Sequence, residues 1–142
     1  MKKDVLITIR GEQTADGELD ASEMTVTGHY FRLGGNYFLY YREVEETGFG
    51  RHRVILKFED EDRVTMQRQG DYKSRLMIER GRRHQCQYDT GFGDLLIGIS
   101  GKRIISHLDD CGGEVEFSYV MDINSQISYE NKVNIQIKEC YN

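Results

Sequence analysis

The stretch GEVEFSYVMDINSQISYENKVNIQIKE, residues 113–139, decides the fold. Apolar side chains recur at a spacing of two in two runs separated by the turn residues Asn124 to Gln126: Val115, Phe117, Tyr119, Met121 and Ile123, then Val133, Ile135 and Ile137. A spacing of two is the period of a β-strand with one buried face. Two such runs joined by a short polar turn predict an antiparallel hairpin.

The rest of the chain repeats this period. Turn signals such as LGGN, EDED and ERGR separate the apolar runs at intervals of roughly 8 to 12 residues, which is typical of an all-β sandwich or barrel. No segment carries a helical apolar stripe after a capping residue, and the connections are too short for crossover helices. We therefore expect antiparallel strands at residues 4–13, 23–33, 36–46, 52–59, 62–69, 73–80, 84–90, 94–100, 103–108, 113–124 and 127–138.

The edges of this sheet decide between a sandwich and a barrel. The chain contains no Pro to blunt an unpaired edge strand, and exposed edges promote aggregation. Gly11, Gly28 and Gly98 fall within strand patterns, where glycine marks the bulges and bends that let a sheet curl. We predict one domain, residues 1–142, folded as a single antiparallel up-and-down β-barrel of about 8 to 11 strands.

Composition restricts the class of protein further. The chain has 142 residues, of which 38% are hydrophobic and 30% charged, as expected for one globular domain. Its net charge of -5 disfavours binding to nucleic acid. It has no apolar run of the ~18 residues that a membrane helix needs, no signal-peptide core, and three cysteines without paired spacing. We expect a cytoplasmic protein without a membrane or nucleic-acid partner.

Catalytic motifs are weak. The triplet Asp89-Thr90-Gly91 occurs in aspartic proteases, but there two carboxylates share a proton and the triplet follows an apolar strand. Here the preceding residues RHQCQY are polar, so Asp89 is expected to end a strand and to bond loop amides. The four histidines lack metal-ligand spacing. We expect no enzyme activity, no metal and no cofactor.

Strand alternation points polar side chains into the barrel. Arg68 continues the inward face of Val64 and Met66. Tyr88 and Thr90 continue the inward face of Cys86, and Tyr119 lies on the inward face between Phe117 and Met121. A buried guanidinium without a partner is strongly destabilising, so Arg68 must find an acceptor. Two interpretations follow. One is an internal polar network with tyrosine hydroxyls, Glu79 or backbone oxygens, and the other is an anion-recognising site for a ligand.

The segment NYFLYYREVEE, residues 36–46, is aromatic on both faces. Alternation places Tyr37, Leu39 and Tyr41 on one face and Phe38 and Tyr40 on the other. Aromatic side chains on an outer face indicate a protein contact or a covering segment. A protein partner, or a second copy of the chain, is therefore an alternative to a small ligand.

The succession LITIRGEQ, MTVTGHYFRLGGNYFLYYRE, VILKF, VTMQRQGDYKSRLMIERG, YDTGFGDLLIGIS, GEVEFSYVMDIN and NKVNIQIKE resembles the YwiB-like family of small bacterial proteins of unknown function. The resemblance covers nearly the whole chain and implies a calycin-like β-barrel, the architecture of lipocalins and fatty-acid-binding proteins. It implies no catalytic signature. The chain lacks the Trp of the lipocalin signature, and residues 12–22 are too few for the helical lid of fatty-acid-binding proteins.

The resemblance supports the fold and leaves the function open. Fatty-acid-binding proteins hold a carboxylate with internal Arg and Tyr side chains, and by analogy of fold alone Arg68, Tyr88 and Tyr119 are candidates for the same use. We therefore expect a non-enzymatic barrel that binds a small amphipathic or anionic ligand through Arg68, Tyr88, Thr90 and Tyr119. The alternative is a filled barrel that contacts a partner through the outer surface around Phe38 and Tyr40. A third interpretation is an unrecognised enzyme that uses the same interior.

Overall fold

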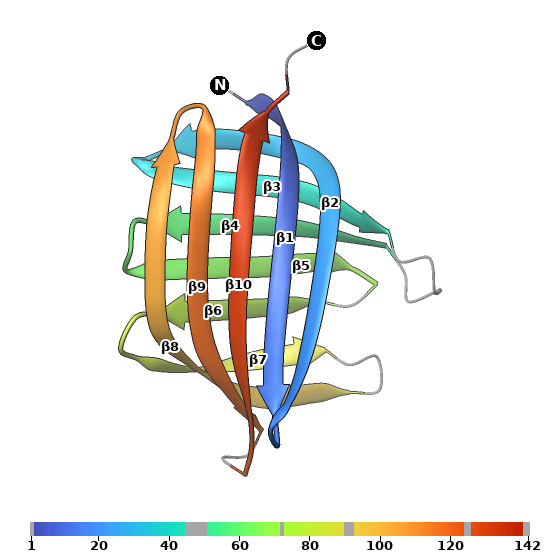
Figure 1. The fold of residues 1–142 in the computed structure, drawn as a ribbon. Coiled ribbons are helices and arrows are strands. Elements are labelled where there is room, and N and C mark those ends of the chain that lie inside the picture. The colour runs from blue at the N-terminus through green and yellow to red at the C-terminus, as the bar shows by residue number, and fades with distance from the viewer. Residues whose placement is uncertain (1, 45–50, 72, 90–92, 124–125, 141–142) are drawn as a thin grey trace.

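A computed structural model of the protein describes residues 2–44, 51–71, 73–89, 93–123 and 126–140 (Figure 1). None of these residues belongs to a helix that could cross a membrane. The ends of three expected strands, at residues 45–46, 90 and 124, lie outside the described residues. Ten strands are described: β1 (Lys3–Ala15), β2 (Glu18–Leu33), β3 (Asn36–Val44), β4 (Arg51–Glu59), β5 (Arg63–Gly70), β6 (Ser74–Glu79), β7 (Arg83–Asp89), β8 (Asp94–Asp109), β9 (Gly112–Ile123) and β10 (Ile127–Glu139).

These strands form one closed, antiparallel, up-and-down barrel. Each strand pairs with its neighbour in sequence, and β1 pairs with β10 to complete the ring. The barrel prediction is confirmed, but one expected turn is wrong. The turn expected between the strands at residues 94–100 and 103–108, in the sequence SGK (residues 100–102), lies inside β8, where the register with β9 shifts between Gly101 and Arg103. This β-bulge absorbs an extra residue without ending the strand.

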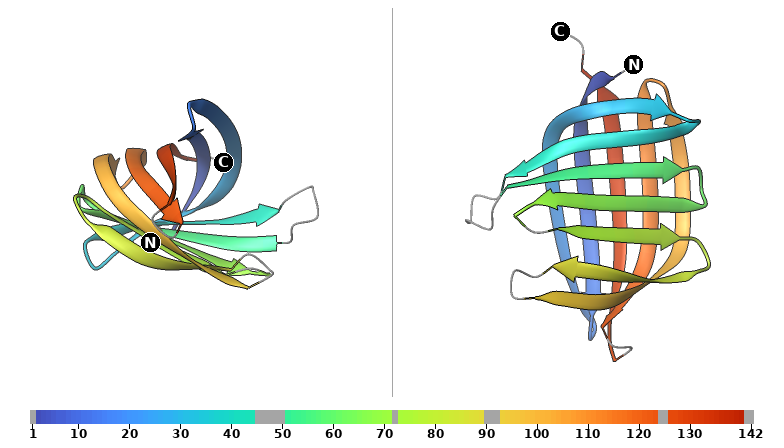
Figure 2. Two further views of the ribbon diagram at one scale, coloured as in Figure 1. Left: turned by 90° about the horizontal axis from the view of Figure 1, so that it is seen from below. Right: turned by 180° about the vertical axis from the view of Figure 1, so that it is seen from behind.

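The barrel is flattened into two layers whose strands run in crossing directions (Figures 1 and 2). The front layer of Figure 1 contains β1, β9, β10 and most of β8, and the back layer contains β3 to β7. β2 bends from the front layer into the back layer and is shared by both. Its register shows the sharing directly, because Gly28 pairs with Val5 of β1 and with Tyr41 of β3.

Gly28 is required by the close approach of three strands. A methyl group added at this position would overlap the backbone oxygen of Tyr40 and lie 2.7 Å from the side chain of Ile7. At Gly11, in β1, the nearest obstacle is Ser22 Oγ at 3.4 Å, which is ordinary contact. Of these two strand glycines, only Gly28 is therefore fixed by packing.

The core is made of apolar side chains that all ten strands contribute. Its largest fully buried members are Tyr30, Phe58, Phe117, Ile7, Leu39, Leu56, Ile78, Ile99 and Ile135. Cys86 is also buried in this cluster, as expected for a small apolar filler.

One end of the barrel is closed by two tyrosines. The Tyr30 hydroxyl donates to the backbone oxygen of Asp109 at 2.8 Å, and the Tyr37 hydroxyl donates to Asp110 Oδ1 at 2.8 Å. The two rings stack with centroids 5.2 Å apart. The turn between β8 and β9 is thereby fastened to β2 and β3.

Gly28→Ala is expected to lower the free energy of unfolding by about 2 kcal/mol or more, because the new methyl group meets backbone that cannot move aside. Gly11→Ala, the matched control, is expected to change it by less than about 1 kcal/mol. Urea denaturation followed by circular dichroism measures both. Equal losses in the two variants would show that Gly28 is not a packing constraint.

Candidate functional site

Strand register gathers the predicted interior side chains on one row of the back layer. Successive ladder partners are Tyr41, Val54, Arg68, Ser74 and Tyr88, one from each of β3 to β7. Ladder partners point to the same face of a sheet, and Val54 on this row is fully buried in the core. Arg68 and Tyr88 therefore both face the interior, as alternation predicted.

Arg68 forms an ion pair with Glu43 at this site. Its Nη2 donates to Glu43 Oε2 at 3.3 Å, and the two side chains keep 23% and 16% of their accessible surface. The Arg68 Nε atom is buried and has no hydrogen-bond partner among the described residues. Nη2 of the guanidinium thus donates to a carboxylate, while the neighbouring donor Nε faces no acceptor in the described part of the chain.

The predicted pairing of Arg68 with Glu79 is wrong, because the two side chains lie on opposite faces of the sheet. Glu79 is the ladder partner of Arg63, and Arg63 is an odd number of residues from Arg68, so the two arginines face opposite sides of the sheet. Glu79 instead accepts a hydrogen bond from Arg63 Nη2 at 3.3 Å and lies 2.8 Å from His84 Nε2. The hydrogen bond with His84 lowers the pKa of the Glu79 carboxyl.

Three phenols lie around the Arg68–Glu43 pair. Burial, reinforced by the Glu43 carboxylate and opposed by Arg68, raises the pKa of Tyr41 to about 12. Burial also raises the pKa of Tyr119, which reaches the site from β9 in the front layer and interacts with the charges of Arg68 and Tyr88. Tyr41 and Tyr119 therefore stay protonated at neutral pH and are available as hydrogen-bond donors.

The walls beside these polar groups are apolar and only partly covered. Met66 lies two residues before Arg68, Met121 lies two residues after Tyr119, and Leu95 is the ladder partner of Tyr88. All three pack against the core without being fully buried. The interior around Arg68 is thus amphipathic.

The structure brings together Arg68, Tyr88 and Tyr119, while Thr90 lies outside the described residues. Sequence reasoning missed Glu43, Tyr41 and the buried His52, which is the ladder partner of Glu43. The signal was present, because the alternation that placed Tyr37, Leu39 and Tyr41 on one face reaches Glu43 at the next step.

Asp89 ends β7, as expected, and its backbone N–H donates to the carbonyl oxygen of Lys73 at 3.2 Å. It pairs with Asp94 at the start of β8, so the two strands form the predicted hairpin. Within the described ranges, no three His, Cys, Asp or Glu side chains lie close enough together to hold a metal ion.

The outer aromatic surface on β2 and β3 is built from stacked cross-strand pairs. Phe38 stacks on Phe31 with ring centroids 5.2 Å apart, and Tyr40 lies 6.0 Å from the ring of His29. Lys57 Nζ lies 5.9 Å from the centre of the Phe38 ring. Phe38 and Tyr40 therefore occupy the face opposite Tyr41, as the alternation predicted.

These features define an all-β protein of the closed, up-and-down barrel class, with the Arg68–Glu43 ion pair in its interior. The chain belongs to the family described as a domain of unknown function (DUF1934), whose model matches residues 7–135. It is 27% identical over 137 residues to the uncharacterized beta-barrel protein YwiB of Bacillus subtilis (strain 168), covering 95% of this chain and 94% of that protein. The crystal structure of YwiB superimposes with a TM-score of 0.77 at 21% identity, covering 95% of this chain and 92% of that one.

The raised pKa of Tyr41 predicts a loss of stability at alkaline pH. Its folded pKa of about 12 lies above the ordinary value near 10, so the unfolded chain releases this proton first. The free energy of unfolding should be unaffected by Tyr41 below about pH 10 and should then fall by up to about 1.4 kcal/mol per pH unit until about pH 12.

Urea denaturation at several pH values above about 9 measures this slope in the wild type and in Tyr41→Phe. The free energy of unfolding should fall less steeply with pH in Tyr41→Phe than in Tyr40→Phe. Tyr40→Phe is the control, because it removes a hydroxyl from the outer face of the same strand. Equal slopes in the two variants would contradict the burial of the Tyr41 hydroxyl.

Proposed function

We propose that this protein is a non-catalytic binding protein for a small amphipathic molecule that carries an anionic group. The anionic group accepts hydrogen bonds from Arg68, and the apolar part lies against the partly covered walls of the same half of the barrel. Three free cysteines, including the exposed Cys111, support residence in a reducing compartment such as the cytoplasm. A closed barrel with a polar internal site also supports the analogy with calycins.

The buried Nε of Arg68 carries the proposal. A buried donor without an acceptor is destabilising by about 1 to 3 kcal/mol, and this atom has no acceptor in the described part of the chain. Glu43 already neutralises the charge of Arg68 through Nη2. An anionic oxygen placed beside Nε would form a charge-assisted hydrogen bond without displacing Glu43.

Tyrosine hydroxyls support an anion over a cation at this position. Tyr41 and Tyr119 are held in their protonated forms, so each can donate to a ligand oxygen. A single guanidinium and two phenol donors are well suited to a carboxylate, which has two oxygens that each accept more than one hydrogen bond. Apolar walls at Met66, Leu95 and Met121 are suited to a hydrocarbon tail.

Isothermal titration of the purified protein with dodecanoate tests this function. The wild type should bind, and Arg68→Gln should weaken binding by about 10-fold or more, since it removes a charge-assisted hydrogen bond of roughly 1.5 to 3 kcal/mol. Arg103→Gln is the matched control, because Arg103 is an exposed arginine on β8 and forms no ion pair with a described residue.

Thermal unfolding shows whether Arg68→Gln remains folded before its affinity is interpreted. A folded wild type that does not bind dodecanoate, or a folded Arg68→Gln that binds as tightly as the wild type, would overturn the proposed site.

A second candidate function is self-association through the outer aromatic surface, favoured by the stacked Phe31 and Phe38 rings. A closed barrel has no free strand edge for pairing with another copy, so an association must use side chains on its outer face. Large aromatic side chains dominate the energetics of such contacts.

Sedimentation velocity over a range of protein concentrations tests self-association. Under this second function the wild type forms dimers, and Phe38→Glu is expected to be monomeric at the same concentrations because a charge would be desolvated in the contact. Leu19→Glu, a substitution at another exposed apolar residue of β2, should leave the dimer intact. A wild type that stays monomeric throughout excludes this function.

A further inference from the structure

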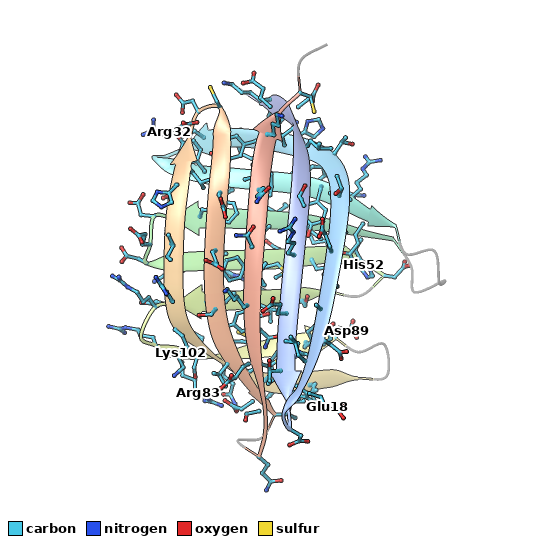
Figure 3. All side chains as sticks on the ribbon, in the orientation of Figure 1. Glu18, Arg32, His52, Arg83, Asp89 and Lys102 are labelled. Carbon is cyan, nitrogen blue, oxygen red and sulfur yellow. The ribbon has the colours of Figure 1, made fainter. Side chains whose placement is uncertain are left out.

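Two amide side chains lie on the front layer beside the interior site. Gln13 of β1 is the ladder partner of Asn131 of β10, and Asn131 is in turn the ladder partner of Tyr119 of β9. We call Gln13 and Asn131 the amide pair. It lies near the turn between β1 and β2, where Glu18, the first residue of β2, is labelled in Figure 3. Because Tyr119 interacts with Arg68, the amide pair continues the interior site across the front layer.

Both amide side chains point into the barrel. An even number of residues separates Gln13 from Ile7 in β1, and Asn131 from Ile135 in β10. Ile7 and Ile135 are buried in the core, and residues at even spacing share one face of a strand. The amide pair is only partly buried, so it faces a less tightly packed part of the interior than the two isoleucines do.

The hydrogen bonds of the amide pair run in one direction. Asn131 Nδ2 donates to the backbone oxygen of Tyr129 at 3.3 Å, and a carbonyl oxygen can only accept. Asn131 therefore turns its Oδ1 toward Gln13, whose Nε2 donates to it at 3.0 Å. Gln13 Oε1 is left as an acceptor, and no group of the described residues donates to it.

The interior beside Gln13 has room for a ligand atom. Gly11 lies two residues before Gln13 on the same inward face. Among the described residues, and apart from those next to it in the chain, a Cβ added at Gly11 would meet one atom within 4 Å, which is Ser22 Oγ at 3.4 Å. The space next to Gln13 is therefore open on the side of Gly11.

We infer that the ligand is a hydroxylated anionic amphiphile, whose hydroxyl group donates to Gln13 Oε1 while its anionic group binds Arg68. This inference rests on the proposed function, and it adds a second polar group to the ligand. An ionised carboxylate has no hydrogen to donate, whereas a hydroxyl has one. A neutral hydroxyl also adds no charge beside the Arg68–Glu43 pair, which is neutral as a unit.

The Gln13 carbonyl would then select for the hydroxyl. A ligand without a hydroxyl displaces water from Gln13 Oε1 and does not replace its hydrogen bond. A hydroxyl placed against an apolar wall likewise loses its bond to water without compensation. The ligand hydroxyl and Gln13 should therefore be coupled, each favouring binding only when the other is present.

Isothermal titration with three probes, below the critical micelle concentration of each, tests this inference. The probes are dodecanoate, 3-hydroxydodecanoate as separate enantiomers, and 12-hydroxydodecanoate, so that the hydroxyl lies near the anionic group or at the far end of the tail. In wild type, at least one hydroxylated probe should bind about 5- to 10-fold tighter than dodecanoate, as expected for one neutral hydrogen bond. In Gln13→Leu, that probe should bind no tighter than dodecanoate.

Gln136→Leu is the matched control. Gln136 is an exposed residue of β10 next to the buried Ile135, so it lies on the outer face. Its preference for the hydroxylated probe should stay within about twofold of the wild-type preference. In Gln13→Leu, Asn131 Oδ1 loses its donor, and a resulting loss of stability affects all probes alike. The ratio of affinities therefore isolates the contribution of the hydroxyl.

The outcomes distinguish this inference from the proposed function. Should wild type bind dodecanoate at least as tightly as every hydroxylated probe, the hydroxyl site is wrong and the Arg68 site stands. A hydroxyl preference that Gln13→Leu retains would overturn the assignment to Gln13 and would also leave the Arg68 site intact. Should wild type bind none of the probes, the proposed function is wrong, and this inference is overturned with it.

Discussion

Hydrogen bonding between the first strand and the last is the constraint on which the rest of the structure depends. β1 pairs with β10 from Val5 opposite Glu139 to Thr14 opposite Glu130, and this ladder converts a ten-stranded meander into a ring without edges. Closure then gives every strand the same inner face. A polar side chain at an inward position has no other face to turn to, so its partner must come from the interior, from water or from a ligand.

The two ends of the barrel solve this problem differently. Tyr30 is nearly inaccessible, yet its hydroxyl reaches the backbone oxygen of Asp109, so the closed end satisfies its polar atoms within the protein. Around Arg68 the protein supplies one carboxylate from Glu43 and leaves a buried donor without a described acceptor. The difference between the ends is one of hydrogen-bond satisfaction as well as of burial, and it is what makes the Arg68 end the better candidate for binding.

Sequence reasoning succeeded where one rule decides the outcome. Period-two alternation placed Arg68, Tyr88 and Tyr119 inside, and the spacing of turns predicted the barrel. It failed where strands must be aligned with one another. Alternation gives the face on which Glu43 lies, but choosing Glu43 as the partner of Arg68 also requires the register of β3, β4 and β5, which the geometry of the turns sets. The turn predicted at the SGK motif was wrong because a β-bulge and a turn favour the same residue types, glycine above all.

The division of charge around Arg68 has a consequence for recognition. The Arg68–Glu43 pair is neutral as a unit, so it exerts little force on a distant anion and acts through short hydrogen bonds. Arg53 and Arg75 lie one residue away from Val54 and Ser74 of the interior row, so their positive charges lie on the opposite face of the sheet. Under the proposed function, the interior therefore selects a ligand by the geometry of its anionic oxygens and by its tail, and long-range attraction contributes little.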